Sequence, residues 1–143
     1  MAAPDFDQVI DKYHLALGEL VKGNPDPATA MFSRQEDVTL ANPFGPVTRG
    51  WKSVVETAQL AASRYRDGEV TSFEEVVRHV TANLAFIVEV ERYKAKVGGR
   101  DDITPVALRV TSIFRLEEGV WKLIHRHADP ITSIQPTESV IQR

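Results

Sequence analysis

The chain has 143 residues, of which 43% are hydrophobic and 26% charged, and its formal net charge at pH 7 is −3. That charge supplies no basic field for a phosphate backbone or an anionic membrane, so we expect no nucleic-acid or membrane partner. The lack of cysteine excludes disulfides, thiolate nucleophiles and thiolate-bound metal clusters. No secretion signal or long apolar run is present, which favours a cytoplasmic protein. A chain of this length suits one domain over residues 1–143, with a core over about 5–129 and a tail over 130–143.

The first half of the sequence predicts helices. Apolar residues recur at steps of three and four from Phe6 to Val21, and Gly23-Asn24-Pro25 follows as a stop signal. Asp26-Pro27 resembles an N-cap followed by a first helical residue. The spacing and the turn residues together predict helices over 6–21, 26–32 and 51–65, an extended piece over 37–41, irregular chain over 42–50, and a turn at Asp67-Gly68 that ends the third helix.

From residue 70 the apolar period changes from 3.6 to 2, which is typical of strands. We expect strands over 70–80, 84–91, 107–116 and 120–128, with Glu118-Gly119 turning the last two into a hairpin. Helices followed by antiparallel strands indicate an α+β fold with the helices gathered on one face of the sheet. A sheet that curls around its helices leaves a cavity, which is the natural place for a ligand.

Two segments carry a family resemblance that covers about residues 5–129. TLANPFGPVTRGWKSV (39–54) and ALRVTSIFRLEEGVWKLIHRHADP (107–130) are similar to segments of the nuclear-transport-factor-2-like superfamily, in particular its SnoaL-like, ketosteroid-isomerase-like and calcium/calmodulin-dependent kinase association domains. The resemblance implies a conical barrel of three N-terminal helices packed in a strongly curved, mainly antiparallel sheet. It implies a dimer and a pocket, but no single activity, because this fold hosts many functions.

The residues of the isomerase mechanism are changed in this chain. The position that resembles the isomerase's carboxylate base falls on Asn42, and the position that resembles its oxyanion-binding Asp falls on Ser112. The position of its Tyr falls near Ala16, with Tyr13 one helical turn earlier. Because a neutral amide cannot accept the proton that this reaction moves, we expect no isomerase activity of that kind.

Strand alternation then predicts which residues line the pocket. If Val110, Ser112 and Phe114 point inward, as the resemblance implies, Ile124, Arg126 and Ala128 point inward beside them. Asn42 and Ser112 would orient a ligand carbonyl or hydroxyl. Arg126 would either stabilise an anionic or carbonyl-bearing ligand or extend its head to solvent at the pocket mouth. The predicted lining is Tyr13, Leu17, Asn42, Phe86, Val88, Val110, Ser112, Phe114 and Arg126.

These observations predict a protein that binds a small molecule in a mostly apolar pocket and needs no cofactor. Whether it is an enzyme stays open; a lyase, isomerase or cyclase of unknown substrate would draw its catalytic groups from Tyr13, Asn42 or His79. The alternative is a non-catalytic association module that forms a homodimer through the convex face of the sheet.

The spacing of His125 and His127 suits metal chelation, but we expect these residues on the convex face without a metal. A shift of one residue in register would exchange the two faces of the last strand, so the choice between Arg126 and the histidines as pocket residues stays open.

Overall fold

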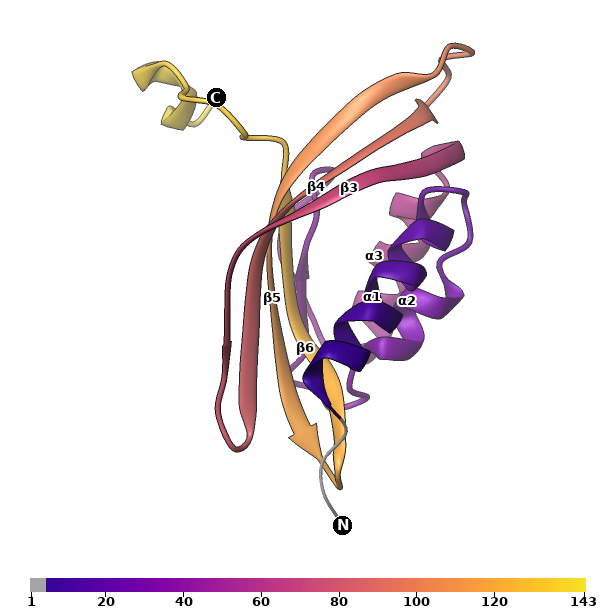
Figure 1. The fold of residues 1–143 in the computed structure, drawn as a ribbon. Coiled ribbons are helices and arrows are strands. Elements are labelled where there is room, and N and C mark those ends of the chain that lie inside the picture. Colours follow the sequence, from indigo (N-terminus) through magenta and orange to yellow (C-terminus); the bar gives the residue numbers. More distant parts are fainter. Residues whose placement is uncertain (1–4) are drawn as a thin grey trace.

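The computed structural model describes residues 5–143 and places its helices on the concave side of a curved sheet (Figure 1). The six strands have the order β2-β1-β6-β5-β4-β3; β1 runs parallel to β6 and the other pairs are antiparallel. The α+β class and the mainly antiparallel curved sheet are confirmed, although the sheet stays open. The elements are α1 (Phe6–Leu20), α2 (Asp26–Met31), β1 (Thr39–Ala41), β2 (Thr48–Arg49), α3 (Trp51–Ala62), β3 (Tyr65–Val80), β4 (Leu84–Val97), β5 (Thr104–Glu117), β6 (Val120–Asp129) and the 3-10 turn η1 (Thr137–Val140).

Helix α1 begins and packs as its sequence pattern predicts. The Asp5 side chain caps it by accepting a hydrogen bond from the Asp7 backbone N–H at 3.0 Å. The stripe at three and four spacing is buried against the sheet, where Phe6 packs edge-on against Phe114 and Trp121. The same stripe carries Tyr13 into the interior, where the residue is fully buried.

The transition from α3 to β3 differs from the expectation. The helix ends at Ala62 and the strand starts at Tyr65, so the pair Asp67-Gly68 lies inside the strand rather than at the end of the helix. The register with β4 shifts between Arg66 and Glu69, and Asp67 has a φ of 54°. The turn chemistry of this pair therefore forms a bulge, which bends the strand without ending it.

A bulge in the pairing of β5 with β6 sets which residues of β6 face the helices. Ile113 pairs with His125 and Phe114 pairs with Leu123, so Ile124 is the extra residue. The buried positions accordingly change from Leu123 on one side of the bulge to Arg126 and Ala128 on the other. Arg126 faces inward as expected. Ile124, which was also expected to face inward, is instead the extra residue of the bulge and is only half-buried.

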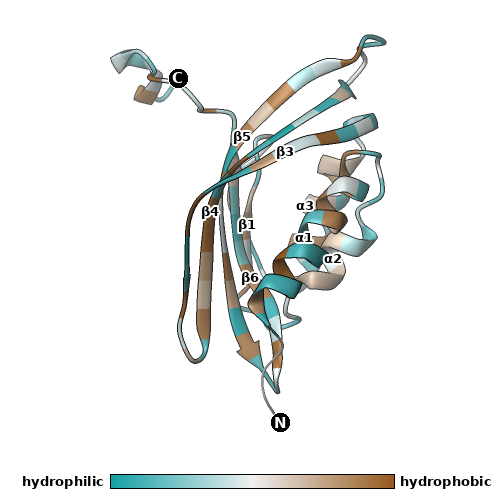
Figure 2. Ribbon diagram, viewed as in Figure 1, coloured by the Kyte–Doolittle hydropathy of each residue, from teal (hydrophilic) through white to brown (hydrophobic). Residues whose placement is uncertain are grey.

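The facing expected for β4 is also wrong. Phe86 and Val88 are only half-buried and alternate with the fully enclosed Ile87 and Glu89. The alternation of the strand is regular, but Glu89 and Glu91 occupy inward positions, because both find partners inside. The apolar stripe that contains Phe86 and Val88 therefore lies on the convex face. Figure 2 shows that part of β4 is coloured as hydrophobic.

No helix within residues 5–143 is long and apolar enough to cross a membrane.

The start of β3 touches the end of α1 where only glycine fits. The Gly68 N–H donates to the Val21 carbonyl oxygen at 3.1 Å, and a Cβ on Gly68 would overlap that oxygen. This contact holds the bulge near the start of β3 against the end of α1, the helix that carries Tyr13.

We predict that Gly68→Ala lowers the free energy of unfolding by about 1–3 kcal/mol, because backbone atoms must shift to admit the methyl group. Gly99→Ala is the matched control, since a Cβ there meets nothing within 4 Å. Urea unfolding of both variants measures the effect. Equal stability of the two variants would contradict the close contact at Gly68.

Candidate functional site

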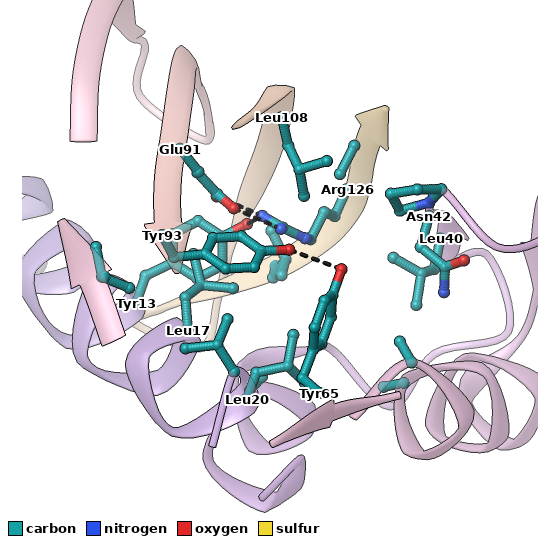
Figure 3. A pocket seen from close by; sticks show the side chains of 18 of the residues that line it. Tyr13, Leu17, Leu20, Leu40, Asn42, Tyr65, Glu91, Tyr93, Leu108 and Arg126 are labelled. Carbon is teal, nitrogen blue, oxygen red and sulfur yellow. Dashed lines mark hydrogen bonds and ion pairs between the residues drawn. The ribbon is translucent and has the colours of Figure 1, made fainter. Parts of the chain in front are cut away.

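A narrow cavity lies between the helices and the concave face of the sheet (Figure 3). The space open to the centre of a water molecule inside it is about 50 Å³. Most of its wall is apolar, and its polar side chains gather on the sheet side. The lining comes from Tyr13, Leu17, Leu20, Val21, Ala28, Phe32, Leu40, Asn42, Pro43, Phe44, Ala58, Ala61, Tyr65, Val70, Phe73, Glu91, Tyr93, Leu108, Leu123, Arg126 and Ala128.

A buried ion pair forms the polar floor of this cavity. Arg126 on β6 donates from Nη1 and Nη2 to the two carboxylate oxygens of Glu91 on β4, at 2.7 and 2.8 Å. Both side chains are more than nine-tenths buried. Burial by itself would lower the pKa of Arg126, but the charge of Glu91 and the hydroxyl of Tyr13 raise it well above its usual value. The guanidinium is therefore a permanent cation with a permanent partner.

Tyr13 connects this pair to the strand between its two members. Its hydroxyl accepts a hydrogen bond from Arg126 Nη1 at 2.8 Å and lies 2.6 Å from the Ser112 hydroxyl on β5. With Arg126 as donor, the Tyr13 proton is free to be donated to Ser112 Oγ. Burial raises the pKa of Tyr13 to about 12, an effect that the nearby Arg126 charge only partly offsets. Tyr13 is therefore a neutral hydrogen-bonding group throughout the physiological range.

A pair of tyrosines stands beside the ion pair. Tyr93 donates to the Tyr65 hydroxyl at 2.7 Å, and the two rings meet edge-on. Burial raises the pKa of both phenols above the usual value, and for Tyr93 the neighbouring Tyr65 raises it further. Since Tyr65 accepts from Tyr93, its own proton remains to be donated. Within residues 5–143 that proton has no acceptor, so it is available to a molecule in the cavity.

Arg126 has donors to spare as well. A guanidinium carries five N–H groups, and Glu91 and Tyr13 take up those on Nη1 and one on Nη2. The second Nη2 proton and the Nε proton have no partner in the part of the chain that the structure describes. The floor is thus electrically balanced and offers hydrogen-bond donors, an arrangement that suits a ligand with an oxygen lone pair and no net charge.

The structure brings four of the predicted site residues to the cavity: Tyr13, Leu17, Asn42 and Arg126. Asn42 lies in the wall, but its Oδ1 accepts the Phe44 backbone N–H at 2.9 Å and thereby closes a local turn. Val110, Ser112 and Phe114 are buried on the concave face, behind the lining side chains. Ser112 acts on the cavity through Tyr13.

Three predicted residues are on the wrong side of the sheet for this cavity. Phe86 and Val88 lie on the convex face, as described above, because Glu89 and Glu91 take the inward positions of β4. His79 is exposed and lies 5.7 Å from the ring of Phe86, its neighbour across the strands. His79 therefore has no route to a ligand in the cavity.

The histidines of β6 alternate with Arg126 and do not line the cavity. His125 Nδ1 lies 2.7 Å from the Thr39 hydroxyl, and His127 Nε2 lies 3.1 Å from an Asp129 carboxylate oxygen. Burial lowers the pKa of His125, and so does the neighbouring His127. Residues 5–143 contain no group of three or more His, Cys, Asp or Glu residues placed to hold a metal ion.

The sequence analysis missed Glu91, Tyr65 and Tyr93. Glu91 alternates with Phe86 and Val88, which the sequence predicted to line the pocket, and its partner Arg126 lies 35 positions further along the chain. The sequence contained one signal for Glu91: an Arg that faces an apolar cavity requires a carboxylate on a nearby strand. Tyr65 was assigned to the end of a helix.

A second buried carboxylate lies between β4 and α1. Glu89 is fully enclosed, and its Oε1 is 2.8 Å from His14 Nε2, while the His14 ring stacks on Phe73 with the centroids 3.6 Å apart. Among the described residues no partner reaches Glu89 Oε2. His14 is therefore a partner of Glu89 that covers this carboxylate, not a freely solvated surface residue.

The model of the SnoaL-like domain family matches residues 6–132. The chain belongs to the SnoaL-like family. No curated protein matches it.

Solved structures share the fold of this SnoaL-like chain at low sequence identity. A nuclear transport factor 2-like superfamily protein from Salmonella enterica superposes with a TM-score of 0.76 at 14% identity, over 92% of this chain and 94% of that one. A putative dehydratase of the NTF2-like family from Streptomyces avermitilis gives 0.68 at 19%, over 89% and 99%. A putative calcium/calmodulin-dependent protein kinase type II association domain from Thiobacillus denitrificans gives 0.67 at 19%, over 92% and 99%. At these identities the likeness establishes the fold of the SnoaL-like chain and no activity.

The raised pKa values of the buried tyrosines should be visible in an ultraviolet titration. The chain has three tyrosines, Tyr13, Tyr65 and Tyr93, and all three have raised pKa values. Near pH 10, where tyrosines in the urea-unfolded chain ionise, we expect less phenolate absorbance at 295 nm from the native protein than from the unfolded chain.

The same shifts determine the pH dependence of stability. A raised native pKa stabilises the fold fully below the unfolded value near 10, and this contribution is lost as pH rises towards 12 for Tyr13. Unfolding free energies measured between pH 9 and 11 should therefore fall, and less so in Tyr13→Phe. A native tyrosine that ionises near pH 10 would contradict this description of the site.

Proposed function

We propose that this SnoaL-like protein binds a small, mostly apolar, uncharged molecule that carries a carbonyl or hydroxyl oxygen. The observation that carries the proposal is the Glu91–Arg126 pair at the floor of an apolar cavity, with unused N–H groups on the guanidinium. The apolar wall provides the burial that binds small ligands, and a few placed donors orient them. Arg126 and the Tyr65 hydroxyl are those donors.

Glu91 is the reason to favour an uncharged ligand over an anion. An unpaired buried guanidinium would attract a carboxylate or phosphate strongly, but here the carboxylate of the chain already fills that role. A second anion would face Glu91 at short range in a region of low dielectric, where like charges repel strongly. Of the two ligand types expected from the sequence, the carbonyl-bearing one suits this floor.

Binding rather than proton transfer is the function that the geometry supports best. A lyase, isomerase or cyclase needs a base in reach of the substrate. Glu91 is the carboxylate that lines the cavity, and both of its oxygens already accept hydrogen bonds from Arg126. Of the three catalytic candidates from the sequence, Asn42 is a neutral amide, Tyr13 is a hydrogen-bonded phenol with a pKa of about 12, and His79 is exposed outside the cavity.

Acetophenone and benzoate test this proposal, because they share a ring and differ in charge. We expect acetophenone to perturb the amide NMR signals of residues such as Leu17 and Leu108 in the cavity wall, and benzoate to bind about ten-fold or more weakly, which is about 1.4 kcal/mol. Ethylbenzene, which lacks the oxygen, should bind more weakly than acetophenone. Stronger binding of benzoate would overturn the proposal.

Removing the charge of Glu91 should reverse this preference. In Glu91→Gln the guanidinium keeps a hydrogen-bond acceptor but loses its counter-charge, so benzoate should bind more tightly than acetophenone. The variant should also lose about 3 kcal/mol of stability, because an uncompensated buried charge remains, and benzoate should restore part of it. Glu74→Gln, which removes an exposed charge paired with Arg92, is the matched control. An unchanged ligand preference in Glu91→Gln would count against the role of the pair.

A second candidate function is self-association through the convex face. There, half-buried or exposed apolar side chains lie next to one another on β3, β4 and β5: Val77, Phe86, Val88, Val90 and Ile113, which we call the convex patch. Apolar surface that is continuous across strands marks an interaction site in a soluble protein. We propose that a second copy of this chain covers it.

The convex patch makes a direct prediction about oligomeric state. The protein should be a dimer at micromolar concentration, and Val88→Asp should make it a monomer, because the new charge would be buried in the interface. Leu60→Asp on α3 is the control, since Leu60 is half exposed on a helix remote from the patch. Sedimentation equilibrium measures both. A monomeric unsubstituted protein, or a dimeric Val88→Asp variant that remains folded by circular dichroism, would refute self-association through this face.

A further inference from the structure

Residues 130–143, the C-terminal arm, leave the end of β6 without packing on the rest of the chain. In Figure 1 the arm extends from the sheet on the side opposite the helices. Every residue from Pro130 to Arg143 is exposed. The hydrogen bonds of residues 133–143 stay within the arm, as between Ser139 and Pro136 or Ile141 and Glu138. At the base of the arm, the Ile131 N–H donates to an Asp129 carboxylate oxygen at 3.0 Å; from Ser133 onward, no hydrogen bond ties the arm to the rest of the described chain.

The arm nevertheless exposes several large apolar side chains. Ile134 is 101% exposed, Val140 86% and Ile141 62%, and Ile131 is exposed as well. Charged residues, by contrast, are few: Glu138 and Arg143. A solvated tail is typically polar and charged, so these apolar side chains indicate a surface that covers them.

The direction of the arm identifies that surface. A two-fold dimer through the convex patch places the second copy on the side of the sheet that faces away from the helices, since the same patch is used by both chains. The arm projects into this same side. A segment that leaves its own sheet there enters the space that the second copy occupies.

Charge also favours a second copy over a charged partner. The charged residues next to the convex patch are paired within the chain, as Arg92 with Glu74 and Arg109 with Asp129. Two such faces can meet without like-charge repulsion. A nucleic acid or an acidic peptide would find no compensating basic surface there.

We propose that the C-terminal arms are exchanged in the dimer: each arm packs its isoleucines against the other copy. This inference rests on the proposed self-association through the convex patch and adds a second contact to it. Pro130 and Pro136 favour the exchange, because they restrict the free arm to extended conformations and so reduce the entropy lost on docking. Pro136 is extended, with φ −64° and ψ 153°.

Substitutions in the arm test its contribution to association. Ile134→Asp combined with Ile141→Asp should raise the dimer dissociation constant ten-fold or more, as measured by sedimentation equilibrium. Leu15→Asp combined with Leu60→Asp, which alters exposed residues on the helices, should leave it unchanged. The melting temperature of the Val88→Asp monomer should not respond to the arm substitutions, because Ile134 and Ile141 are exposed in the single chain. Unchanged dimerisation in the arm variant would overturn the proposal.

Spin labelling shows which copy the arm touches, and the cysteine-free sequence makes a single label simple to place. Ser133→Cys carrying a nitroxide is mixed with isotope-labelled, unsubstituted chain, so that NMR reports only effects on the other copy. We expect broadened amide signals in the isotope-labelled copy, which has no cysteine and no spin label, relative to a control with reduced nitroxide. A dimer without such broadening would refute arm exchange while leaving self-association intact, whereas a monomeric protein would refute both.

Discussion

The pairing of Glu91 with Arg126 is the interaction on which the interior of this protein depends. The two charges come from β4 and β6 and meet in front of β5, where Ser112 and Tyr13 complete the hydrogen bonds. Burying either charge alone would cost several kcal/mol, so each requires the other. The pair exists because the bulge at Ile124 shifts the phase of β6 and turns Arg126 inward. The polar floor of the cavity thus follows from one extra residue in one strand.

The same alternation shapes the outer surface. When Glu89 and Glu91 point inward on β4, Phe86, Val88 and Val90 must point outward, because side chains alternate strictly along a strand. The strand therefore contributes a carboxylate to the cavity and an apolar stripe to the convex face. A shift of β4 by one residue would remove both features together. The proposed ligand binding and the proposed self-association are consequently linked through the register of a single strand.

The sequence was sufficient for the fold and insufficient for the facing of β4. Helical spacing, the hairpin turn at Glu118-Gly119 and the resemblance predicted the α+β class, and the stripe of α1 placed Tyr13 in the interior. For β4, however, both faces of the alternation are plausible: an apolar face normally turns inward, and only distant partners reverse this choice. Glu91 finds Arg126 and Glu89 finds His14, 35 and 75 positions away. Ile124 likewise has no glycine or proline to mark its bulge.

The polar groups of the cavity act as hydrogen-bond donors. Tyr13, Tyr65 and Tyr93 keep their protons well into the alkaline range, and Arg126 keeps its charge, while Glu91 has both oxygens occupied. A molecule that enters therefore meets N–H and O–H groups and no free base. Such a site can hold a carbonyl oxygen and stabilise partial negative charge on it, but it cannot remove a proton from carbon. For this chain to catalyse enolisation, Arg126 would have to release Glu91, and the energy of a buried charge pair opposes that release.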